Sequence, residues 1–268
     1  MIIGGKKFEN HTYIMGILNV TPDSFSDGGR YSTTDKALKH TEQMISDGAD
    51  IIDVGGESTR PGYTRITSDE ETERVCPVIE KIKANFDIPV SVDTYHHTVA
   101  DSALHSGADL INDIWGFRYD DGEMASVAAG HNVPVCLMHN RKGMEYDDFF
   151  NDVLSDLSES IRIARDAGIT DDKIILDPGI GFAKTLEQNL ELTNSLEILK
   201  PLGYPVLLGT SRKSMIGLSL DLPVDQRLEG TLVTTVLAVQ KDCLFVRVHD
   251  VKENKRAVMM TEKLMGKL

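Results

Sequence analysis

Two carboxylates and one carboxamide, Asp93, Asn112 and Asp177, each stand at the end of a short apolar stretch of the chain. A carboxylate accepts two parallel N–H bonds, so the set suits a flat heterocycle with several N–H donors and one or two ring acceptors. The same residues could hold a divalent metal ion, act as a glycosidase acid/base pair, or form only a buried polar network. The single Trp and few aromatic residues argue against sugar binding.

Cationic side chains follow two later apolar stretches, at Lys213, Arg247 and His249. The chain has a net charge of -14, so a local cluster of cations favours an anion site over an accidental surface patch. The alternative is ion pairing with Asp177 or Asp250. Because the cations accompany the heterocycle-binding set, they indicate a ligand that carries an anionic group.

Two further stretches could extend this anion site. Thr59 and Arg60 stand in a polar, glycine-rich segment, and Asn19 offers an amide oxygen to a magnesium ion that keeps most of its waters. Together with the cations, these residue types indicate a diphosphate ester of an amidine-bearing heterocycle.

The stretch Ile17–Gly29 begins as an apolar strand and continues as a polar connection that carries Phe25. Pro22 and the pair Gly28 and Gly29 exclude a helix here. Connections of this length are uncommon in compact domains unless they are functional, so the apolar residue predicts a lid that closes over a ligand. A solvated surface loop is the alternative.

Composition sets outer limits on the class of protein. With 268 residues, 41% of them hydrophobic, the chain can bury a large core, whereas its negative charge argues against a nucleic-acid or anionic membrane partner. The three cysteines are widely spaced without a CxxC pattern, which is typical of reduced thiols, and we expect Cys136 to be a core residue. Without a transmembrane-length apolar run or a signal-like N-terminus, we expect a cytoplasmic protein.

Apolar stretches alternate with amphipathic helical stretches along the chain. Eight strands are predicted at Tyr13–Val20, Ile51–Val54, Val90–Asp93, Leu110–Ile114, Val133–Met138, Ile174–Asp177, Val206–Leu208 and Leu244–Val248. Helices are predicted at Thr34–Asp47, Ser68–Phe86, His96–Ser106, Gly122–Gly130, Asp147–Ala167, Leu186–Leu199, Asp225–Gln240 and Asn254–Met265. This alternation predicts an α/β protein, a single (β/α)8 TIM-barrel domain over residues 1–268 with a short hairpin at Ile2–Phe8. An open doubly wound sheet is the alternative, but its GxGxxG motif is absent.

The barrel explains where the polar residues stand. Active sites of such barrels lie at the C-terminal ends of the strands, and phosphate is frequently held after the last two strands, where Lys213, Arg247 and His249 follow. A single Asp in this position is more typically a helix N-cap, as for Asp250, where a helix follows directly. Polar residues at all eight strand ends favour a ligand site.

Eight segments carry a resemblance to a known family: GILNVTPDSFSDGG, DVGGESTRPG, SVDT, LINDI, DPGIGFAKT, LLGTSRKSMIG, RLEG and RVHDV. In this order, along nearly the full chain, they resemble the dihydropteroate synthases of folate biosynthesis. The resemblance implies a transferase that condenses 6-hydroxymethyl-7,8-dihydropterin diphosphate with 4-aminobenzoate, in a pocket that sulfonamides also occupy. It also implies Mg2+ and a homodimer formed through barrel helices.

The same resemblance implies roles for individual residues. The pterin would be held by Asp93, Asn112, Asp177 and Lys213, and the diphosphate by Thr59, Arg247 and His249 with Asn19 on magnesium. The aminobenzoate side would be formed by Phe25, Arg60, Pro61, Phe182, Ser211 and Lys213. Cleavage of the carbon–oxygen bond beside the electron-rich ring favours an SN1-like path in which Asp27 faces the developing cation and Lys213, Arg247 and His249 complete the catalytic set.

Two other functions are compatible with parts of this pattern. A corrinoid-linked methyltransferase would use a similar pterin-binding barrel, although the lid and the SRK segment would then lack a role. A non-catalytic pterin-binding paralogue would keep the heterocycle-binding set while losing lid or anion residues. Both sets are present in this chain.

Overall fold

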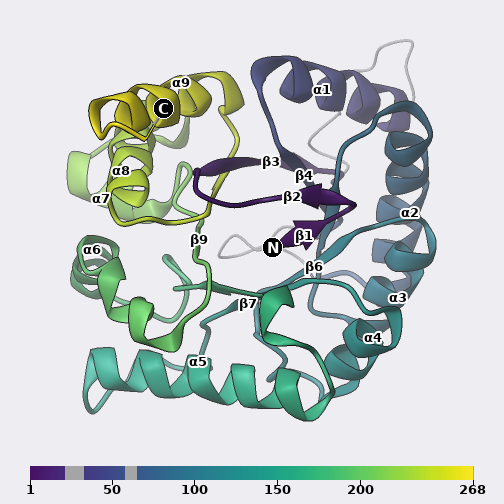
Figure 1. Cartoon of the computed structure of the whole chain (residues 1–268), viewed down its shortest axis with the longest axis horizontal. Helices are drawn as coiled ribbons and strands as arrows, with labels where there is room; N and C mark the ends of the chain where they lie inside the picture. The colour runs from purple at the N-terminus through teal and green to yellow at the C-terminus, as the bar shows by residue number, and fades with distance from the viewer. Residues whose placement is uncertain (22–32, 58–64, 268) are drawn as a thin grey trace.

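The computed structural model describes residues 1–21, 33–57 and 65–267 of the chain. Eight parallel strands surround a common axis and helices cover their outer side, as Figure 1 shows in a view along the barrel. The strands are β3 (Tyr13–Asn19), β4 (Ile51–Gly55), β5 (Val90–Asp93), β6 (Leu110–Asp113), β7 (Val135–Met138), β8 (Ile174–Asp177), β9 (Leu207–Leu208) and β10 (Phe245–Val248). Their order is β8-β7-β6-β5-β4-β3-β10-β9, and a parallel bridge between Leu176 and Val206 closes the ring. The predicted (β/α)8 barrel is confirmed.

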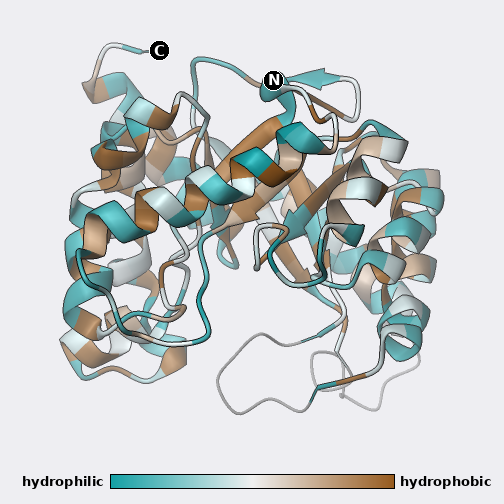
Figure 2. Ribbon diagram, turned by 90° about the horizontal axis from the view of Figure 1, so that it is seen from below, coloured by the Kyte–Doolittle hydropathy of each residue, from teal (hydrophilic) through white to brown (hydrophobic). Residues whose placement is uncertain are grey.

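Successive side chains of each strand point alternately toward the helices and into the barrel. In β3, Ile14 and Leu18 belong to the apolar layer between strands and helices, whereas Met15 belongs to a separate cluster inside the barrel. The inner cluster is apolar near the strand starts, where Ile3 and Phe8 from the N-terminal hairpin cover it. Figure 2 shows apolar residues concentrated on the central strands. Polar inward positions are therefore left to the opposite, C-terminal end of the barrel.

The hairpin and helices follow the predicted pattern with shifted ends. Strands β1 (Ile2–Ile3) and β2 (Lys6–Lys7) form the hairpin. The helices are α1 (Thr33–Asp47), α2 (Ser68–Asn85), α3 (His97–His105), α4 (Glu123–His131), α5 (Phe149–Asp166), α6 (Leu186–Asn194), α7 (Ser214–Leu220), α8 (Leu228–Gln240) and α9 (Val251–Leu264). None of the helices in the described ranges has both the length and the apolar character needed to cross a membrane.

Three differences separate the observed helices from the predicted ones. The helix predicted to continue to Leu199 ends at Asn194 and is followed by a 3-10 helix, Leu196–Leu202, that contains Pro201. Helix α7 was not predicted, because seven residues are too few to show a helical period, and α8 begins at Leu228 instead of Asp225.

The connection between β8 and α6 is fixed by specific polar contacts. Gly179 has a φ of +70° and lies so close to His139 that a Cβ atom there would be 1.9 Å from the His139 carbonyl oxygen. At the other end, Thr185 and Gln188 form a capping box that begins α6. The segment between them, which carries Phe182 and Lys184, is thus held at both ends.

We predict that Gly179→Ala lowers the free energy of unfolding by more than about 2 kcal/mol, because left-handed strain adds to the overlap with the His139 carbonyl. Gly168→Ala is the matched control, since Gly168 has a φ of +95° but an added Cβ would meet no atom within 4 Å. It should cost only about 1–2 kcal/mol. Equal losses in urea unfolding would show that the close approach carries no energetic weight.

Candidate active site

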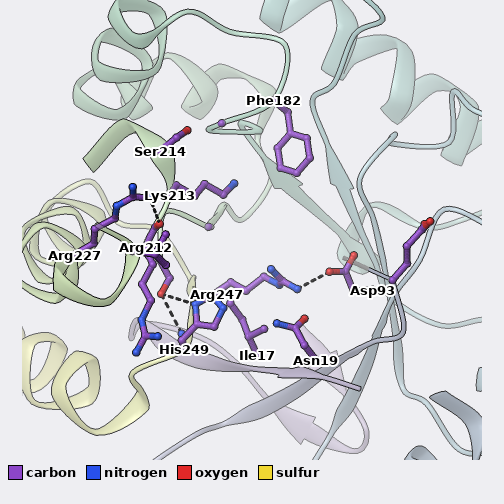
Figure 3. Close-up of a pocket in the computed structure, with 15 residues that line it drawn as sticks. Ile17, Asn19, Asp93, Phe182, Arg212, Lys213, Ser214, Arg227, Arg247 and His249 are labelled. Carbon is purple, nitrogen blue, oxygen red and sulfur yellow. Dashed lines mark hydrogen bonds and ion pairs between the residues drawn. The ribbon is translucent and has the colours of Figure 1, made fainter. Parts of the chain in front are cut away.

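A cavity of about 340 Å³ opens at the C-terminal ends of the strands. Figure 3 shows side chains from opposite sides of the barrel pointing into it. It brings together seven of the residues predicted from the sequence: Asn19, Asp93, Phe182, Ser211, Lys213, Arg247 and His249. Asn112 and Asp177, each 4% exposed, are buried at the ends of β6 and β8. The predicted residues Phe25, Asp27, Thr59, Arg60 and Pro61 lie outside the described residues.

Arg247 is the centre of the charge arrangement. Its Nε donates to Asp53 Oδ2 at 2.5 Å and one terminal nitrogen donates to Asp93 Oδ2 at 2.5 Å (Figure 3 draws the bond to Asp93). Asn112 Nδ2 donates to the same Asp53 oxygen at 3.2 Å. Arg247 therefore crosses from β10 to β4 and β5, and it joins three strands that are far apart in the sequence.

Burial and neighbouring charges oppose each other in this group. Burial raises the pKa of Asp93 to about 6, although Arg247 lowers it. Burial lowers the pKa of Arg247, but Asp53 and Asp93 overcome this effect and raise it above its ordinary value. The guanidinium therefore remains charged, and Asp93 titrates closer to neutral pH than an ordinary carboxyl group does.

Asp53 belongs to the buried charge group of the site, although no site role was assigned to it from the sequence. It is completely buried, and its Oδ1 has no hydrogen-bond partner among the described residues. The available signal was a carboxylate inside the apolar strand Ile51–Gly55, where an ion needs a partner. The sequence does not show which cation is this partner, because the two residues meet only when the barrel is closed.

Lys213 joins the two predicted substrate sides. Its amine donates to the Ile180 carbonyl and lies 4.7 Å from the centroid of the Phe182 ring. Burial lowers the pKa of Lys213 to about 8, while Asp177 raises it. Asp177 Oδ1 accepts a 2.7 Å hydrogen bond from the Gly179 N–H, and burial raises the pKa of Asp177. The lysine charge is thus placed between a carboxylate and an aromatic ring.

Ser211 lies against both the backbone and the ring of His249 and favours one tautomer of that ring. The backbone N–H of His249 donates to Ser211 Oγ at 3.1 Å, and the same hydroxyl lies 3.0 Å from His249 Nδ1. When the hydroxyl proton points to Nδ1, the ring carries its own proton on Nε2 and can donate it to an anion. Asp250 is not a side-chain N-cap, since its carboxylate accepts from Arg212 Nε at 2.9 Å.

A buried network beside the cavity was also missed. The amine of Lys184 lies 2.8 Å from His139 Nδ1 and donates to the carbonyls of Gly179 (2.9 Å) and Phe182 (3.1 Å). His139 Nε2 lies 3.0 Å from Asp156 Oδ2, so a neutral histidine donates there and accepts from the lysine. Burial lowers the pKa of Lys184 to about 7 and that of His139 to about 4. The network fixes the segment that carries Phe182.

The fold and the site define a barrel enzyme whose mouth combines polar groups for a heterocycle with cations for an anion. A family model described as pterin binding enzyme matches residues 15–249. The dihydropteroate synthase of Clostridium beijerinckii is 63% identical over 265 residues, which cover 98% of each chain. The chain therefore belongs to the pterin-binding enzyme family, among the dihydropteroate synthases, which are transferases of folate biosynthesis.

Solved structures agree with this assignment. The dihydropteroate synthase of Clostridium difficile, crystallised in the presence of pteroic acid, has a TM-score of 0.93 and 51% identity, with 97% of this chain and 98% of that chain covered. That of Xanthomonas albilineans in complex with 7,8-dihydropteroate has a TM-score of 0.88 and 39% identity, covering 95% and 94% of the two chains.

We predict that Arg247→Met lowers the free energy of unfolding by about 3–5 kcal/mol, because it leaves Asp53 and Asp93 buried without their cation. Arg212→Met is the matched control. The Arg212–Asp250 pair is more exposed, with side-chain exposures of 34% and 18%, and its loss should cost about 1 kcal/mol or less. Denaturant unfolding of the two variants would reject this role of Arg247 if their losses were equal.

We also predict that Lys184 makes stability depend on pH. Its pKa is about 7 in the folded protein against 10.5 ordinarily, so the unfolded chain binds more protons between these values. The free energy of unfolding should therefore rise with pH in this window, by up to about 1.4 kcal/mol per pH unit. Lys213 shifts in the same direction, so the measurement is the difference between the parent and Lys184→Met. A difference that does not change from pH 7 to 10 would contradict the prediction.

Proposed function

We propose that the chain condenses 6-hydroxymethyl-7,8-dihydropterin diphosphate with 4-aminobenzoate to give 7,8-dihydropteroate and diphosphate. The observation that carries the proposal is the meeting of Asp93, Lys213, Arg247 and His249 in one cavity, since it combines carboxylate acceptors with cations in an acidic chain. The Xanthomonas albilineans relatives solved with 4-aminobenzoic acid and with 7,8-dihydropteroate support the substrate and the product.

The pterin is assigned to Asp93, Asn112, Asp177 and Lys213. Asp177 has committed one oxygen to the Gly179 N–H, which leaves the second to accept from an amidine edge. Asn112 donates to Asp53 through its amide nitrogen, so its amide oxygen remains as an acceptor. Lys213 adds a donor for a ring acceptor. A pterin edge presents the complementary donors and acceptors.

The diphosphate is assigned to Thr59, Arg247 and His249, with Mg2+ on Asn19. The residues fit this ion: Asn19 and Asp93 both line the cavity, and an oxygen of each lies 3.7 Å from the position that a Cβ at Gly55 would occupy, so both oxygens face the same part of the site. Magnesium prefers oxygen ligands and is commonly held by few protein groups together with substrate phosphates. When bound, it would neutralise charge on the leaving diphosphate.

The aminobenzoate is assigned to Phe25, Arg60, Pro61, Phe182, Ser211 and Lys213. Phe182 lies beside the Lys213 amine and offers an aromatic face to the second ring. The Yersinia pestis relative solved with a sulfonamide drug supports a pocket that also accepts sulfonamides. The lid proposed for Ile17–Gly29 would complete this side after the pterin has bound.

The reaction follows from the chemistry of the substrate. The carbon–oxygen bond breaks with its electron pair on the diphosphate, and the positive charge at carbon is delocalised into the dihydropterin ring. Arg247 and His249 stabilise the negative charge of the leaving group, and Asp27 faces the cation. The arylamine nitrogen then forms the new bond to carbon and loses a proton. No covalent protein nucleophile takes part.

A homodimer is proposed from the outer surface. Large apolar side chains are exposed on α7, α8 and α9, at Leu218, Leu220, Val233, Met259, Met260 and Leu264. Such a concentration on adjacent helices favours a protein interface.

The free thiols of Cys136 and Cys243 support a reducing, cytoplasmic location for the protein.

The direct test combines the purified chain, Mg2+, the pterin diphosphate and labelled 4-aminobenzoate. Label should pass into dihydropteroate in an amount equal to the diphosphate released. Tight binding of the pterin without any labelled product would exclude the transferase and favour the pterin-binding paralogue.

We predict that His249→Ala weakens binding of the pterin diphosphate by about 1.5–3 kcal/mol, since it removes a donor to a charged group, while the pterin alcohol binds almost unchanged. Asp177→Ala is the matched control and should weaken both ligands equally. The affinities are measured by calorimetry with the two ligands. If His249→Ala weakened the binding of the pterin diphosphate and of the pterin alcohol equally, His249 would not belong to the anion site.

We predict that Asp27→Ala leaves the affinity for pterin diphosphate nearly unchanged and lowers the single-turnover rate by about 100-fold, because its contact is made chiefly to the developing cation. Asp23→Ala, in the same stretch, should change neither quantity. A loss of affinity as large as the loss of rate would assign Asp27 to ground-state binding.

A further inference from the structure

Two glutamates and a histidine meet beside the active-site cavity, outside the residues assigned to substrates. Glu57 follows β4, Glu71 lies in the first turn of α2, and His96 precedes the first residue of α3. Each offers one ligand atom, and these three atoms all lie within 4.8 Å of one another. Glu57 and Glu71 belong to one βα unit and His96 to the next, so the pairing of neighbouring units in the barrel brings the histidine to the two carboxylates.

The two carboxylates are buried and incompletely bonded. Glu57 is 7% exposed and Glu71 is 1% exposed. One oxygen of Glu57 accepts from the Ile66 N–H at 3.1 Å, and one oxygen of Glu71 is hydrogen-bonded to Thr94. The second oxygen of each, Oε2, has no hydrogen-bond partner among the described residues. Two buried acceptors left open side by side are costly unless a cation or a proton lies between them.

Among the described residues, no cationic side chain hydrogen-bonds to either of these open oxygens. The guanidinium of Arg74 lies near, but it donates to the Gly56 carbonyl at 3.0 Å and to Glu70. Burial, together with the Glu57 and Asp93 carboxylates, raises the pKa of Glu71 to about 8, so two negative charges at this place need compensation. Burial lowers the pKa of His96, which favours the neutral ring that metals bind.

We propose that Glu57, Glu71 and His96 form a binding site for a first-row transition-metal ion. Two carboxylate oxygens and one imidazole nitrogen suit Zn2+, Mn2+, Fe2+ or Co2+, whereas Mg2+ prefers oxygen ligands alone. Three protein ligands leave coordination positions for water. The bound ion would tie the end of β4 to the starts of α2 and α3, and it would stiffen the rim of the cavity that Glu57 also lines.

The test uses Co2+ as a spectroscopic probe on chelator-treated protein in the absence of substrates. A second cluster of potential ligands among the described residues, Asp101, His105 and His131, lies on the outer helices α3 and α4, so all proteins carry His131→Ala. We expect one Co2+ per chain, visible absorption bands of a nitrogen-ligated ion, and a higher melting temperature when Zn2+ is added.

Variants decide whether the ion lies in this cluster. His96→Ala and Glu71→Gln should each weaken Co2+ binding by at least about tenfold and abolish the Zn2+-dependent rise in melting temperature. Asn19→Ala is the control and should leave Co2+ binding unchanged, since that residue belongs to the magnesium site. His96 is only partly buried, so its variant keeps the test valid if Glu71→Gln folds poorly.

The proposal is overturned if Co2+ binds equally well to the parent and to both variants, if Asn19→Ala alone removes it, or if the parent binds no Co2+ at all. The last result would leave a proton as the group shared by Glu57 and Glu71. None of these outcomes depends on the transferase activity, so the failure of one proposal is distinguishable from the failure of the other.

Discussion

The bonding of Arg247 to Asp53 and Asp93 is the constraint on which the rest of the site depends. Burying two carboxylates inside a barrel is unfavourable unless a cation and good hydrogen bonds accompany them. Arg247 meets this requirement from β10, and Asn112 adds a second hydrogen bond to the Asp53 oxygen. The same bonds also fix Asp93 and Asn112, which the proposed function assigns to the pterin.

This arrangement has a consequence for anion binding. One guanidinium shared by two carboxylates presents no net positive charge, so Arg247 alone cannot attract a diphosphate. In the proposed site the attraction for a diphosphate would therefore come from Lys213, from His249 and from the Mg2+ assigned to Asn19, in a chain whose net charge is -14. In the proposed site, Arg247 would donate hydrogen bonds in fixed directions, and the other cations would supply the positive electrostatic potential.

The fold could be predicted well because strands and helices are indicated by patterns within short stretches of the sequence. Each strand is a short apolar run with a polar end, and barrels place such ends together, so Asp93, Lys213 and His249 were correctly expected at one mouth. The partners of Arg247 could not be predicted, because Asp53 and Asp93 are 194 and 154 residues away and meet it only across the closed ring. The contact between Lys184 and His139, 45 residues apart, was missed for the same reason.

The buried ionisable groups also indicate how the site selects its ligand. The pKa of Asp93 is raised to about 6 and that of Lys213 is lowered to about 8, so both charges are held at a cost that burial imposes. A ligand that donates N–H bonds to the carboxylates and accepts one from the lysine stabilises the charged forms and recovers that cost. A ligand with the opposite pattern faces unpaired buried charges. In the proposed site, these charges would favour a pterin edge over an isosteric ring that lacks its donors and acceptors.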